Sequence, residues 1–197
     1  MKERMLSALK EYRMVTAIKD IKGLERCLGC ESPVVFVLFG SINNIPDIVN
    51  RLKERDKIVI VHVDLINGLS NDPAAIEFIK GFTRADGIIT TRPHMIKVAN
   101  QHGLIAIQRF FLLDSRAIQS CKKYLASGTA DLIEILPGCM PKVIREIIGY
   151  AKVPLIAGGL ILDGEDCAMA LEAGAVAVST TNAGIWSTAL GGGAADV

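Results

Sequence analysis

Short apolar segments rich in β-branched residues recur along the chain at near-regular intervals. Several of them, such as VVFVLF and KIVIV, are apolar at consecutive positions and would therefore be apolar on both faces of a strand. Strands of this kind are typical of parallel sheets that helices cover on both sides. The pattern predicts eight strands, at residues 14–19, 34–39, 58–64, 87–90, 104–108, 132–136, 154–157 and 175–179.

Helix signals fill the gaps between these segments. Asp72 precedes Pro73, as a capping side chain precedes a first-turn proline, and Gly103, Gly128 and Gly174 end helical stretches. Strand and helix therefore alternate eight times, at about 25 residues per unit. The charged, helix-prone segment 1–12 precedes the first strand and is expected to close the bottom of a barrel.

Eight βα units predict an α/β fold, a compact single-domain (β/α)8 TIM-type barrel over residues 1–197. An open, doubly wound sheet is the alternative. No G-x-G-x-x-G motif follows the first predicted strand, which disfavours the dinucleotide-binding version of that alternative.

The charge balance restricts the partners that we expect. The chain has 22 Lys+Arg and 21 Asp+Glu, a formal net charge of +1, which argues against a general polyanion binder. A local basic patch is still compatible with RNA binding, although an exposed helix surface explains each patch equally well. The candidate patches are residues 51–57 and the group of Arg116, Lys122, Lys123, Lys142 and Arg145.

Cysteine content and hydropathy point to a cytoplasmic protein without membrane contact. The five cysteines are an odd number and no signal peptide precedes them, so we expect reduced thiols. No apolar run reaches the roughly 18 residues of a membrane span. Cys27 and Cys30 form a C-x-x-C without a second half-site, which we interpret as the end of a helix, with a redox or metal site as the alternative.

A phosphate site is predicted after the last two strands. Gly158 and Gly159 follow the seventh strand, and Ser179 and Thr180 end the eighth. In barrels the loops after strands seven and eight often bind phosphate, because glycines let an anion approach backbone N–H groups and hydroxyls add donors. A tight turn and a helix cap are the structural alternative. Trp186 follows, and we expect it to pack against the last helix rather than stack on a base.

Polar residues also interrupt the ends of the predicted strands. His62 and Asp64 share a face by strand alternation and are expected to point into the barrel near its mouth. Buried charges require partners, so the set should form a network that grips a small polar ligand, supplies acid and base groups, or only neutralises itself. Its further members are Lys19, Thr90, Gln108 and Glu134, with Arg92 and Arg109 at the mouth ends of strands four and five.

Six sequence blocks together resemble the glycerol-3-phosphate-responsive antiterminator family, the regulators of bacterial glycerol uptake operons. The blocks lie in separate βα units and span about residues 14–187. They are VHVDLINGL, ADGIITTRPHMIKVAN, IAIQRFFLLDS, IEILPGCMPKVI, VPLIAGGLI and AVSTTNAGIW.

The resemblance implies a barrel with glycerol 3-phosphate as effector, no other cofactor, and binding to the leader mRNA so that transcription passes a terminator. By position, the phosphate would lie on Gly159, Leu160, Ser179 and Thr180. The glycerol end would face Lys19, His62, Asp64, Gln108, Arg109 and Glu134.

Two classes of function follow. The first is a metabolite-sensing RNA regulator with no catalytic residue and no metal ligand. Such a regulator could be a homo-oligomer. The alternative is a barrel enzyme acting on a small phosphate ester, with His62, Asp64 and Glu134 as acid and base candidates.

Overall fold

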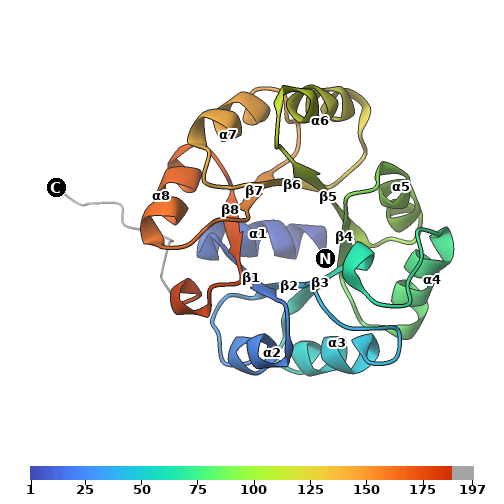
Figure 1. Ribbon diagram of the computed structural model, residues 1–197. Helices are drawn as coiled ribbons and strands as arrows, with labels where there is room; N and C mark the ends of the chain where they lie inside the picture. Colours follow the sequence, from blue (N-terminus) through green and yellow to red (C-terminus); the bar gives the residue numbers. More distant parts are fainter. Residues whose placement is uncertain (188–197) are drawn as a thin grey trace.

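In the computed structural model, which describes residues 1–187, parallel strands close into a barrel in the order β1 to β8, with helices around it (Figure 1). The predicted (β/α)8 barrel is therefore confirmed; residues 188–197, which the prediction also included, lie outside the described residues. The strands are β1 (Met14–Ile18), β2 (Val34–Val37), β3 (Ile58–His62), β4 (Gly87–Thr90), β5 (Ile105–Phe111), β6 (Leu132–Leu136), β7 (Leu155–Gly158) and β8 (Ala177–Thr180).

Each strand is followed by a helix or a short 3-10 turn that begins near the mouth of the barrel. Aspartate caps begin α2, α4, α6 and α8; Asp20, for example, accepts the backbone N–H of Gly23 at 2.7 Å. The helices are α1 (Lys2–Tyr12), α2 (Ile21–Cys27), α3 (Ile45–Lys53), α4 (Pro73–Phe82), α5 (Pro93–Gln101), α6 (Ser115–Ser127), α7 (Pro141–Ile148) and α8 (Gly164–Glu172). The 3-10 turns are η1 (Val63–Leu65) and η2 (Ala183–Ile185).

Strand alternation divides the core into two parts. In register across β1, β2 and β3, Ala17, Phe36 and Ile60 fill the barrel interior, while Ile88 and Ala106 belong to the layer between sheet and helices. The third strand is shorter than the predicted 58–64, because η1 begins directly after His62. Asp64 therefore lies on a turn, and strand alternation does not determine where its side chain points.

Helix α1 closes the bottom of the barrel, where the strands begin. Met5, Ala8 and Leu9 are buried in the same cluster as the interior strand residues. Figure 1 shows α1 lying across the ring, behind the strands. This confirms the expected role of segment 1–12.

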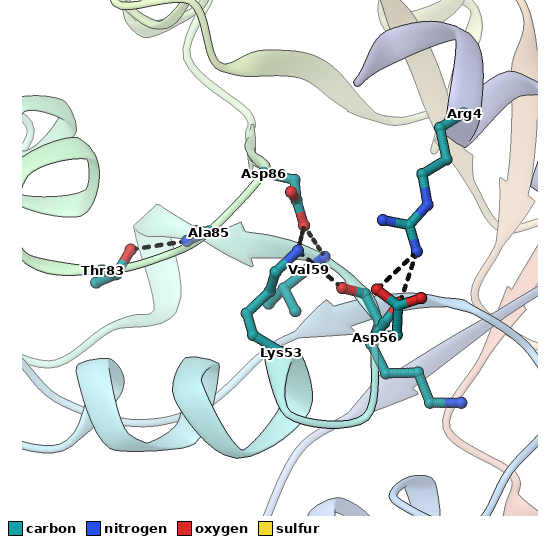
Figure 2. Close-up of polar contacts among 8 residues, drawn as sticks. Arg4, Lys53, Asp56, Val59, Thr83, Ala85 and Asp86 are labelled. Atoms are coloured by element: carbon teal, nitrogen blue, oxygen red, sulfur yellow. Dashed lines mark hydrogen bonds and ion pairs between the residues drawn. The ribbon is translucent and has the colours of Figure 1, made fainter.

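Ionic contacts at the bottom tie neighbouring βα units together. Asp86, directly before β4, binds the Lys53 ammonium at 2.7 Å and accepts the backbone N–H of Val59 at 2.8 Å (Figure 2). At the same end, Arg4 of α1 reaches Asp56 at 3.1 Å. These contacts connect α1, α3, β3 and β4.

The basic run 51–57, a candidate RNA patch, is largely used in this framework. Besides Lys53, Arg51 pairs with Glu25, and the buried Lys57 ammonium donates to the carbonyls of Cys30 and Ser32. The run therefore does not form an open basic surface. None of the helices in residues 1–187 has the length and apolar character needed to cross a bilayer.

Candidate functional site

A cavity of about 520 Å³ opens at the mouth of the barrel, where β1, β6, β7 and β8 end. Sites of this size and position hold small ligands in many barrels. We call it the mouth cavity. It is lined by Ala17, Lys19, Leu38, Arg109, Glu134, Leu136, Gly159, Leu160, Ile161, Leu162, Ser179, Thr180, Thr181 and Asn182.

The loop after β7 presents its backbone to this cavity. Gly159 and Leu160 both adopt left-handed backbone conformations, with φ of +71° and +54°. Glycine suits the first position, since a Cβ there would lie 3.0 Å from Leu136 Cδ2. Within residues 1–187 the N–H groups of Gly159 and Leu160 donate no hydrogen bond, so they are available to an anion.

The loop after β8 differs from the sequence expectation in how it can hold phosphate. The Ser179 hydroxyl donates to Glu134 Oε1 at 2.5 Å, and the Thr180 hydroxyl donates to the Ile161 carbonyl at 2.9 Å. Both hydroxyl hydrogens are thus already used, although both residues line the cavity. The Thr181 N–H, in contrast, donates no hydrogen bond within the described part of the chain.

The floor of the mouth cavity carries a buried ion pair. Arg109 and Glu134 are neighbours in the register of β5 and β6, and Arg109 Nε lies 2.5 Å from Glu134 Oε2. Gly158 makes room for this carboxylate, because a Cβ there would lie 2.6 Å from Glu134 Oε1. With the exposed Lys19, the charged lining comprises two cations and one anion, which favours an anionic ligand.

His62 and Asp64 lie outside the lining of the cavity. Burial, and secondly the nearby Arg109 charge, lower the pKa of His62 to about 4, so its imidazole is neutral at pH 7. Its Nδ1 atom is buried and has no partner within residues 1–187. Burial raises the pKa of Asp64, but hydrogen bonds from the Thr91 N–H and from the Thr90 and Thr91 hydroxyls outweigh it, and the net shift is downward.

Thr90 and Gln108 also lie away from the cavity. They are register neighbours on the outer face of the sheet, one position out of phase with the interior residues Ile89 and Ile107. The Gln108 amide donates to the Thr90 carbonyl at 3.2 Å and to the Arg109 carbonyl at 3.1 Å. These hydrogen bonds fix the ends of β4 and β5 at the mouth, so the two residues position the site without lining it.

The structure thus brings seven of the predicted site residues to the mouth cavity and leaves five outside its lining. Apart from Leu160, sequence reasoning missed the apolar part of the lining, although Leu38 could have been found two positions after the inward-facing Phe36. The seven are Lys19, Arg109, Glu134, Gly159, Leu160, Ser179 and Thr180; the five are His62, Asp64, Thr90, Gln108 and Gly158.

Cys27 and Trp186 are buried residues that pack in the core. Cys27 is the last residue of α2, and burial raises the pKa of its thiol to about 12, which suppresses thiolate chemistry. Trp186 is buried and donates its indole N–H to the Thr180 carbonyl at 2.9 Å, so it packs in the core as expected, although beside α2 and not against the last helix α8. Within residues 1–187 no three His, Cys, Asp or Glu side chains gather in a way that could hold a metal ion.

One family model matches nearly the whole chain. The family model described as glycerol-3-phosphate responsive antiterminator matches residues 14–186. A protein of Escherichia coli (strain K12), named uncharacterized protein YgcP, is 42% identical over 185 residues, which cover 94% of this chain and 97% of that protein.

Two solved structures extend this similarity to the fold. A glycerol uptake operon antiterminator regulatory protein from Listeria monocytogenes is 34% identical with a TM-score of 0.85, covering 89% of this chain and 95% of that one. A glycerol uptake operon antiterminator-related protein from Thermotoga maritima is 35% identical with a TM-score of 0.77, covering 88% of this chain and 96% of that one.

Proposed function

The chain belongs to the glycerol-3-phosphate responsive antiterminator family, and from this membership we propose that it is a cytoplasmic transcription antiterminator that binds glycerol 3-phosphate in the mouth cavity. Its second partner is the leader mRNA of a glycerol uptake operon. Effector binding stabilises one arrangement of the mouth loops, and that arrangement binds the RNA more tightly.

One observation carries the proposal: the mouth cavity combines free backbone N–H groups with an excess of positive charge. Gly159, Leu160 and Thr181 offer N–H donors to a phosphate, and Lys19 adds an ammonium that has no ion-pair partner in the part of the chain that the structure describes. The Arg109–Glu134 pair on the floor offers both donors and acceptors to hydroxyl groups of a glycerol moiety. A small polyol phosphate matches this distribution of groups.

The hydrogen bonds that the candidate acid and base groups already make favour a role in binding over one in catalysis. Both carboxylates already accept hydrogen bonds, Glu134 from Arg109 and Ser179, and Asp64 from Thr90 and Thr91. For Asp64 these hydrogen bonds outweigh burial and lower the pKa of the carboxyl, which makes it a weak base, and the Glu134 carboxylate is occupied by its two donors. We therefore assign this set to orienting the ligand and holding the mouth together.

Calorimetric titration with glycerol 3-phosphate tests the effector site. Lys19→Gln should weaken binding about tenfold, because it removes a cation from the lining of the mouth cavity without breaking a hydrogen bond or ion pair among residues 1–187. Lys142→Gln removes an exposed lysine of α7 and should leave the affinity within about twofold.

A gel-shift assay at fixed salt concentration, with and without glycerol 3-phosphate, tests the RNA function. We expect tighter binding of leader RNA in the presence of effector. Equal RNA affinity in both conditions would contradict the switch, and turnover of a glycerol or triose phosphate would favour the enzyme instead.

A further inference from the structure

A second cavity, of about 290 Å³, adjoins the mouth cavity between α2 and the turn η2. Figure 1 shows α2 beside the turn η2, which lies near the end of the described residues 1–187. We call this cavity the α2 groove; Lys19, Asp20, Lys22, Arg26, Thr181 and Asn182 are the residues that matter here. Lys19, Thr181 and Asn182 line both cavities.

The α2 groove concentrates cations that have no partner. Lys22 and Arg26 are four residues apart on α2, which places them on one side of the helix, and Lys19 lies just before the helix and lines the same groove. All three are exposed, and within residues 1–187 none of them forms a salt bridge or a side-chain hydrogen bond. Three cations therefore lie around a single carboxylate, that of Asp20.

The acidic residues at and near α2 compensate these charges only in part, since one carboxylate faces three cations. The Asp20 carboxylate already accepts the N–H of Gly23 at 2.7 Å. Glu25 does not line the groove, and it pairs with Arg51 of α3 at 2.7 Å. The groove thus has a local positive charge that the net charge of the whole chain conceals.

The chemistry of the groove fits phosphate groups rather than bases. Lysine and arginine bind phosphate oxygens, and arginine does so in a bidentate manner. The aromatic residue of the groove, Trp186, is buried and uses its N–H on the Thr180 carbonyl, so it offers no face for base stacking. A chain of phosphodiesters is the polyanion that suits such a lining.

We infer that the α2 groove binds the phosphodiester backbone of the leader RNA, an inference that rests on the function proposed above. Because Thr181 and Asn182 line both cavities, a phosphate held by the Thr181 N–H in the mouth cavity fixes the wall that the RNA contacts. The shared wall gives the effector a direct route to the affinity for RNA.

The double variant Lys22→Gln/Arg26→Gln tests this site, since neither residue lines the mouth cavity. In gel shifts with labelled leader RNA and saturating glycerol 3-phosphate, we expect at least a tenfold loss of affinity. The plot of log affinity against log salt should become less steep by about 1.4, that is, by about 0.7 for each lost phosphate contact to a single strand. Glycerol 3-phosphate affinity should stay within about twofold of wild type.

Lys142→Gln/Arg145→Gln is the matched control, because it removes the same charge from exposed positions on α7 that belong to the second candidate patch, and it therefore separates the groove from that patch. It should retain wild-type affinity for RNA, and Lys22→Arg/Arg26→Lys should retain most of it. An equal loss in both double variants, or no loss in the groove variant, would overturn the inference while leaving the proposed function intact. A wild-type protein that binds glycerol 3-phosphate but no RNA would overturn both.

Discussion

The two ends of the barrel treat charge in opposite ways. At the bottom, aspartates that precede strands bind both a lysine and a backbone N–H: Asp86 binds Lys53 and the N–H of Val59, and Asp131 binds Lys2 and the N–H of Ala106. At the mouth, Lys19 and its neighbours on α2 have no partner among residues 1–187, and backbone N–H groups are left open. The two aspartate sites at the bottom are therefore complete in themselves, whereas the mouth, beside its buried Arg109–Glu134 pair, has unused capacity for a partner.

The apolar packing follows the same division. Leu9 of α1 is fully buried among the barrel residues at the bottom. At the mouth, Leu160 and Leu162 are 61% and 64% exposed. A protein with this asymmetry should lose stability when its bottom is altered and lose binding when its mouth is altered, and three predictions test this difference.

The largest effect is expected from Asp86→Ala at the bottom. The substitution leaves the Lys53 ammonium and the Val59 N–H without their shared acceptor in a site where both side chains of the pair are 11% exposed or less. Breaking such a buried pair should lower the free energy of unfolding by about 3 to 4 kcal/mol. Urea denaturation followed by circular dichroism measures this change.

The control for Asp86→Ala breaks an exposed ion pair. Glu25→Ala removes the partner of Arg51 on the outer surface and should cost less than about 0.5 kcal/mol. If Asp86→Ala unfolds the protein, Asp86→Asn, which retains an acceptor for the Val59 N–H, measures the charge contribution alone. A loss below about 1 kcal/mol for Asp86→Ala would show that the bottom does not depend on its ion pairs.

The same contrast explains which features could be predicted from the sequence. Strand positions and the α1 plug follow from local patterns, since runs such as VVFVLF have to be covered on both faces. The loops after β7 and β8 were also predictable, because Gly158 and Ser179 stand at strand ends. These features depend on neighbours in the sequence.

Hydrogen-bond partners and strand limits were not predictable in this way. Strand alternation holds for His62, the buried register partner of the interior Ile89, but it does not extend to Asp64, because η1 begins directly after His62. The use of the Ser179 hydroxyl by Glu134 depends on a residue 45 positions away. The groove likewise requires α2 and the end of β8 to meet, which no single segment encodes.

The second prediction concerns His62, which lies between the apolar interior and the charged mouth. Its pKa is lowered from 6.5 to about 4 in the folded protein, so between these values the unfolded chain binds a proton that the folded chain does not. Stability is therefore lost as the pH falls from 6.5 towards 4, by roughly 3 kcal/mol in total. Urea denaturation at pH 7 and pH 4.5 should show most of this loss in the wild type.

His62→Gln should remove this part of the pH dependence. His94→Gln, which removes an exposed imidazole on α5, is the control and should retain the wild-type dependence. If the stability of His62→Gln depended on pH as strongly as that of the wild type, His62 would be accessible to protons in the folded state. It would then belong with the mouth rather than with the interior.

The smallest effect on stability is expected from a matched pair of glycine substitutions, one at each end. Gly159 at the mouth and Gly103 at the bottom have almost the same φ, +71° and +67°. Alanine at either position should cost about 1 to 2 kcal/mol of unfolding free energy, because L residues disfavour this conformation.

The surroundings of the two glycines differ: a Cβ at Gly159 would lie 3.0 Å from Leu136 Cδ2, whereas at Gly103 it meets nothing within 4 Å. Gly159→Ala should therefore also displace the N–H donors of its loop and weaken glycerol 3-phosphate binding about tenfold, the cost of one charge-assisted hydrogen bond, while Gly103→Ala leaves binding unchanged. Denaturation and calorimetry on both variants separate the two contributions, and equal affinities would mean that the loop after β7 does not hold the phosphate.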